Sequence, residues 1–160
     1  MADYRIVRVN RRDHNSFALA MEDMGVIIEH GYYWKKSQRP HMPVGTPVIA
    51  AGTYDGAGMF LIGIVTGEWE IEPHPTTMPQ SDKPSDYQYH YRIPVQWQPV
   101  VYWHDKGTDA VHEINDMIDG FNYRFGATLT QVEFRKVLNY VLHGEAINPW
   151  EYAQQYAQAA

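Results

Sequence analysis

The sequence of 160 residues contains no cysteine, so disulfide bonds, thiolate metal ligands and a cysteine nucleophile are all excluded. It also lacks any apolar run approaching the length of a membrane-spanning helix. The first ten residues, "MADYRIVRVN", carry charges where a signal peptide needs an apolar block. We therefore expect a cytoplasmic protein that makes no use of a membrane.

Familiar catalytic and cofactor motifs are missing as well. The sequence contains no GxSxG, HExxH, Walker loop or GxGxxG. Its eight histidines offer only weak pairings. His112 and Asp116 are one helical turn apart and are better explained by a solvated helix face, whereas His104 beside Asp105 is typical of a loop cap. We expect no catalytic residues, no metal and no cofactor, which favours a binding module over an enzyme.

The charge is low in total but unevenly distributed. The formal net charge is −6, which argues against a protein that simply coats nucleic acid. Residues 1–44 hold seven Lys or Arg against five Asp or Glu, whereas residues 45–160 hold six against fourteen. Any contact with nucleic acid is therefore expected mainly in the N-terminal quarter.

The first third of the chain shows clear strand signals. Alternation in "YRIVRV" predicts a strand over residues 4–9, and a short helix is expected between a cap at Asn15 and a stop at Gly25. The clearest strand pair covers 48–51 and 60–65, joined by the Asp-Gly turn signal of "TYDGAG".

The middle of the chain combines a long loop with two more strands. "EPHPTTMPQSDKPSDY" holds four prolines and no periodicity, which predicts a long surface loop of the kind that is often functional. "YHYRIPVQWQPVVYW" then predicts two strands, with Pro94 marking an edge or a bend. Because Ile93, Val95 and Trp97 share one strand face, Trp97 is expected in the core.

After residue 104 the pattern becomes helical. An apolar stripe predicts a helix over 108–120, and Thr130 with Glu133 forms a capping box before a second helix that extends to residue 142. Asn148-Pro149 opens a last helix, in which Trp150 is expected to pack the helix against the domain. The whole predicts an α+β fold: a small, curved, mostly antiparallel sheet of five or six strands closing into a partial barrel, with helices packed around it.

Aromatic residues make up 14% of the chain, and two of the five tryptophans occupy unusual positions. In "GYYWKK", Trp34 stands among cations in a segment that reads as a loop. Trp69 lies where a strand leaves the sheet for the long loop. At such positions an indole can remain exposed for a ligand, and a base can stack on it while cations hold phosphate. One of the two preceding tyrosines is expected to turn inward.

The order of these elements resembles the EVE and YTH branch of the PUA-like superfamily. The resemblance covers about residues 4–142 and is carried by "YRIVRVN", "GYYW", "LIGIV" with Gly63, and Val95 with Trp97 in "YRIPVQW". It implies a small curved PUA-like β-barrel with flanking helices. We assign residues 1–145 to this domain and 146–160 to a C-terminal helix and tail.

The resemblance also implies a function, in which a flipped and often modified base is held in an aromatic cage. Trp34 matches the first cage tryptophan and Asn10 a polar residue at the base edge, while Trp69, Tyr87 or Tyr89 has to supply the second wall. The base-binding candidates are Asn10, Tyr33, Trp34, Ser37, Trp69 and Tyr87. The phosphate-binding candidates are Arg11, Arg12, Lys35, Lys36 and Arg39.

We therefore expect a reader of a modified base in nucleic acid, with DNA favoured over RNA. EVE-like modules commonly serve methylation-dependent restriction systems, which implies a nuclease as a fused domain or a separate partner. Two alternatives stay open. One is a small PUA-like hydrolase or nuclease of the ASCH type that uses the same pocket, and the other is a protein-interaction module suited to the acidic C-terminal part.

Overall fold

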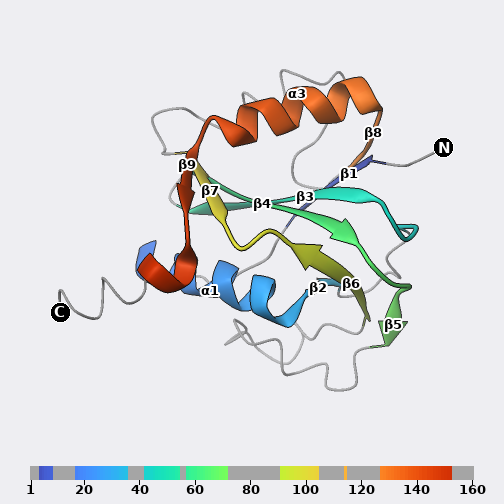
Figure 1. The fold of residues 1–160 in the computed structure, drawn as a ribbon, viewed down its shortest axis with the longest axis horizontal. Helices are drawn as coiled ribbons and strands as arrows, with labels where there is room; N and C mark the ends of the chain where they lie inside the picture. Colours follow the sequence, from blue (N-terminus) through green and yellow to red (C-terminus); the bar gives the residue numbers. More distant parts are fainter. Residues whose placement is uncertain are drawn as a thin grey trace.

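The computed structural model describes residues 4–8, 17–35, 42–54, 57–71, 91–104, 114 and 127–152. These residues form a mixed α+β structure around a nine-stranded, mostly antiparallel sheet. Figure 1 shows α1 on one face of the sheet and α3 on the other. The elements are β1 (Tyr4–Arg8), α1 (Phe17–His30), β2 (Tyr32–Lys35), β3 (Pro47–Tyr54), β4 (Ala57–Val65), β5 (Glu70–Ile71), β6 (Tyr91–Trp97), β7 (Val101–His104), β8 (Ala127–Leu129), α3 (Gln131–Leu142) and β9 (Glu145–Ile147).

The main path of the sheet runs in the order β2-β6-β4-β3-β1-β8. Strand β5 adds to β6, β7 adds to β4, and β9 adds to β7, while β1 runs parallel to β3. The two ends of this path, β2 and β8, do not pair within the described chain, so the sheet is not closed there. The expected count of five or six strands is wrong, because β2, β5, β8 and β9 have only two to four residues each and are too short to show a period.

Alternation along the central strands produces two apolar cores, one on each face of the sheet. On β4, Met59 and Leu61 belong to the core that α1 covers, whereas Phe60 belongs to the core under α3. The strand predictions for the first strand, for the central pair and for β6 and β7 are confirmed, as is the core position of Trp97.

Helix α1 does not stop at Gly25, so that expectation is wrong. The helix continues to His30, and Gly31 ends it with a φ of 72° and an N–H that donates to the carbonyl of Ile27 at 3.1 Å. Gly25 is instead a point of close packing, because a Cβ there would lie 3.1 Å from Cβ of Pro149. The helix therefore touches the turn that follows β9.

The two helix starts in the C-terminal part are confirmed. At α3, the Thr130 hydroxyl accepts from the Glu133 N–H at 3.1 Å, and the Glu133 carboxylate accepts from the Thr130 N–H at 2.9 Å. At the last helical turn, Oδ1 of Asn148 accepts from the N–H groups of Trp150 and Glu151 at 3.0 and 3.1 Å.

Trp150 itself belongs to neither apolar core. Its side chain is 37% exposed, whereas Pro149 is buried and Tyr152 packs against the core under α1. Strand β9 pairs with β7 across the boundary between residues 145 and 146, so the pairing continues into the segment that begins at residue 146. Figure 1 shows β9 running beside β7 from the end of α3 towards α1.

Some expected elements lie outside the described residues. These are the Asp-Gly turn at 55–56, the proline-rich loop after Ile71 and the helix expected over 108–120, of which only Ile114 is described, in helical conformation and buried. None of the described helices is long and apolar enough to cross a membrane.

Gly63 carries the first prediction. A Cβ at this position would lie 2.6 Å from Cε3 of Trp97 and 2.8 Å from the carbonyl oxygen of Gln96. Because the backbone oxygen cannot move aside, Gly63→Ala should lower the free energy of unfolding by about 1–3 kcal/mol. Urea unfolding measures this change.

The matched control is Ile64→Ala, the next residue along β4, whose side chain is 52% exposed. Its cost should stay within about 1 kcal/mol. A Gly63→Ala protein as stable as the parent would show that the sheet can open around Trp97.

Candidate functional site

The candidate site lies where β2 and β5 flank β6. Trp34 on β2 pairs with Arg92 on β6, and Arg92 pairs on its other side with Glu70 on β5. Directly opposed residues of antiparallel strands share a face, so these three side chains project from the same side of the sheet. We call the following group the aromatic edge: Tyr32, Trp34, Trp69, Glu70, Tyr91 and Arg92.

Pro94 explains why β5 begins as a separate strand. The Val95 N–H donates to the Gly31 carbonyl on the β2 side at 2.9 Å, so the nitrogen of Pro94 faces the opposite side, towards β4 and β5. On that side the pairing of β4 with β6 ends at Val65, and the N–H of the next residue, Thr66, donates to the Pro94 carbonyl at 3.0 Å. The proline therefore costs the sheet no hydrogen bond. The segment between β4 and β5 then places Trp69 next to the edge of β6.

Arg92 connects the two outer strands of the aromatic edge. Its Cζ lies 4.1 Å from the centroid of the Tyr32 ring, and its Nε donates to Oε1 of Glu70. The side chains of Arg92 and Glu70 are 21% and 42% exposed, so solvent screens the ion pair and it adds at most about 1 kcal/mol. Its main effect is to hold the planar guanidinium across the sheet between the two tryptophan-bearing segments.

Trp34 is not the exposed loop residue that the sequence predicts. It lies on β2 with only 7% of its side chain exposed, so that expectation is wrong. Its ring contacts Tyr32 at a centroid distance of 5.7 Å and His30 edge-on at 6.1 Å. The physical reason is that three consecutive aromatic residues favour a strand, and β6 supplies its partner.

The two tyrosines before Trp34 lie on opposite faces of β2. Tyr33 pairs with Ile93, and Tyr32 pairs with Pro94. Both are partly buried and pack against the core under α1. The two tyrosines therefore lie on opposite faces of β2, and neither side chain is fully buried in the core.

Trp69 is partly buried and meets Tyr91 edge-on, with 5.9 Å between the ring centroids. Tyr91 follows the long loop and begins β6. Trp69 and Trp34 therefore lie on opposite flanks of one strand, although they come from distant parts of the sequence.

The described residues include only part of the predicted site. Tyr33, Trp34 and Trp69 are described, and Lys35 is placed on β2 by its backbone. The remaining candidates lie outside the described residues: Asn10, Arg11, Arg12, Lys36, Ser37, Arg39, Tyr87 and Tyr89. Their roles stay predictions.

Four members of the aromatic edge are not among the residues predicted from the sequence, namely Tyr32, Glu70, Tyr91 and Arg92. A signal for two of them was present, because Arg92 falls on the face of β6 opposite to the core residue Ile93 and Tyr91 stands at the end of the long loop. Their meeting with Trp34 depends on the register between β2 and β6, which no local pattern reveals.

His104 is packed into the fold. It is buried at the end of β7, where its Nε2 lies 3.1 Å from the Val141 carbonyl and its ring stacks on Tyr140 at 4.3 Å. The expected loop cap at this position is therefore wrong. Within the described ranges, no three His, Asp or Glu side chains are grouped to hold a metal ion.

No protein-family model matches the sequence, and no curated protein matches it either. A partly exposed guanidinium over the Tyr32 ring, on the face of the sheet that it shares with Trp34, is chemically suited to a flat, π-rich ligand.

Because Trp34 is buried, we expect its replacement by alanine to destabilise the fold, which an exposed ligand-binding tryptophan would not do. Trp34 and Trp97 are 7% and 6% exposed, so Trp34→Ala should lose about 3–5 kcal/mol of stability, as Trp97→Ala should. Trp34→Phe keeps a ring against Tyr32 and should fold. Thermal unfolding of the three variants checks this, with Trp150→Ala as the exposed-tryptophan control; a parent-like Trp34→Ala would mean that the indole is not packed.

Proposed function

We propose that the protein is a PUA-like reader of a modified base, acting in the cytoplasm on DNA. The observation that supports this most is that Trp34 pairs with β6 on one flank while Trp69 contacts Tyr91 at the start of β6 on the other. The family resemblance draws its two cage walls from the same two segments. A base stacked on one of these rings would gain about 1–3 kcal/mol from that aromatic face.

Entry of the base needs a local rearrangement, since little of Trp34 is exposed. His30 is itself exposed and contacts the indole edge-on, so its side chain is the one we expect to move. Extrusion of the base costs a few kcal/mol, and least from a single strand. Arg92 then offers a guanidinium plane beside the bound base.

Phosphate contacts are proposed at the cations that surround the aromatic edge in sequence. Lys35 follows Trp34 directly on β2. The other proposed contacts are Arg11, Arg12, Lys36 and Arg39, all in the part of the chain with positive net charge. Cleavage is assigned to a nuclease that is fused to this module or acts as a separate partner.

Trp69→Ala is the direct test of the proposed cage. It should weaken binding of a short oligonucleotide with one modified base by about 1–3 kcal/mol and abolish the preference over the unmodified strand. Fluorescence polarisation with single- and double-stranded DNA and RNA measures both effects, using Trp34→Phe as a second variant. Trp150→Ala removes an exposed tryptophan elsewhere and should change neither quantity.

If Trp69→Ala keeps the preference, the second wall is not Trp69. If the parent protein binds modified and unmodified strands equally, the reader proposal fails as a whole. A preference for RNA over DNA would support the proposed cage but contradict the proposed DNA substrate.

Replacing Lys35 and Lys36 with glutamine tests the phosphate contacts. The slope of log affinity against log salt on duplex DNA should become shallower by about 0.9 for each phosphate that is no longer neutralised, whatever the sequence. Arg135→Gln with Lys136→Gln removes two exposed charges on α3 and should leave the slope unchanged. An unchanged slope in the Lys35 and Lys36 variant would place the phosphate contacts elsewhere.

A further inference from the structure

A pocket of about 460 Å³ lies where β7, β9 and the last helical turn meet. Its volume falls in the range of small-molecule sites, about 300–1,000 Å³. The pocket is lined by residues from β7, from β9 and from the turn after Asn148, and none of them belongs to the aromatic edge.

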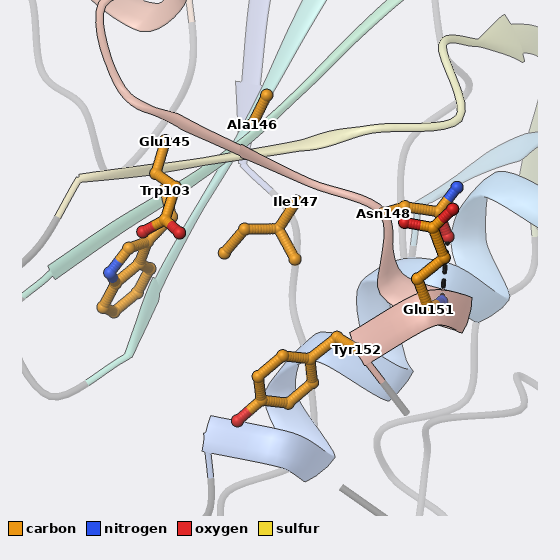
Figure 2. Close-up of a pocket in the computed structure, with 7 residues that line it drawn as sticks. All are labelled: Trp103, Glu145, Ala146, Ile147, Asn148, Glu151 and Tyr152. Carbon is orange, nitrogen blue, oxygen red and sulfur yellow. Dashed lines mark hydrogen bonds between the residues drawn. The ribbon is translucent and has the colours of Figure 1, made fainter. Parts of the chain in front are cut away.

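The lining carries negative charge at two separate places. Figure 2 shows Glu145 beside Trp103 and Glu151 beside Asn148, with Ile147 between the two carboxylates. Trp103 and Glu145 are cross-strand partners on β7 and β9. Glu151 is held at the other end because its N–H donates to Oδ1 of Asn148.

Apolar side chains lie between the carboxylates, although polar atoms provide the larger part of the pocket surface. The Ile147 side chain and the ring of Tyr152 line this part of the pocket (Figure 2). Glu145 and Glu151 are exposed, and neither forms an ion pair with a cation among the described residues. The pocket also belongs to the acidic part of the chain, where residues 45–160 hold fourteen Asp or Glu against six Lys or Arg.

This arrangement selects a particular class of ligand. A metal ion needs oxygen ligands that converge on one point, but here Ile147 separates the two carboxylates. A ligand with a single ammonium group would pair with only one of the two carboxylates and leave the other without a partner. Aromatic faces next to carboxylates attract organic ammonium groups, and an apolar floor favours an alkyl chain.

We propose that this pocket binds a linear aliphatic diamine or polyamine. One ammonium group contacts Glu145 beside the Trp103 ring, and the other contacts Glu151. The alkyl chain lies over Ile147 and Tyr152. The site is independent of the proposed base-binding edge.

Isothermal titration of the full chain with putrescine, spermidine and n-butylamine at matched ionic strength tests the site. Putrescine should bind about tenfold more tightly than n-butylamine, because only the diamine makes both charge contacts. Glu145→Gln and Glu151→Gln should each weaken putrescine binding about fivefold. The double variant should bind putrescine no better than n-butylamine.

Glu29→Gln is the matched control, since it removes one exposed carboxylate on α1 outside the pocket. It should leave putrescine binding unchanged, and a thermal melt of each variant checks that the fold is intact. Equal affinity for putrescine and n-butylamine, no measurable binding, or equal losses in Glu29→Gln and the pocket variants would each overturn the proposal.

Discussion

Trp97 packs its ring across the bare Cα of Gly63, and its Nε1–H donates to the Tyr32 carbonyl at 3.2 Å. The same residue therefore fixes the separation of β4 and β6 and ties β2 to the pair. Since Trp34 follows Tyr32 on β2, its register against Arg92 is set through this contact. The geometry of the aromatic edge thus depends on a core residue that no ligand would touch.

Regular parts of the fold could be predicted from the sequence because their signals are local. The continuous apolar run around Met59 and Phe60 is typical of a strand that is buried on both faces, and the Thr130–Glu133 pair specifies a helix start. The end of α1 could not be predicted in this way. Gly25 looks like a stop signal, but it is a point of close approach to Pro149, a residue far along the chain.

The sequence could indicate which tryptophans belong to the candidate site, but not how they are buried or which residues surround them. Position in the sequence singled out Trp34 and Trp69, and pairing on β6 brings their segments together. Exposure of Trp34 could not be judged, because whether "YYWK" is a loop or a strand depends on a partner strand much later in the sequence. The Arg92–Glu70 ion pair needs the same non-local register, so it too was missed.

The contact between Gly25 and Pro149 has a consequence for the way the chain folds during synthesis. Helix α1 presents Met21, Met24 and Ile27 to the core, yet the turn that packs on it is synthesised much later than the helix itself. Strand β1 likewise waits for β8 to cover its outer edge. The N-terminal elements therefore emerge with apolar surfaces that stay uncovered until these later segments are made, and such surfaces are prone to aggregation.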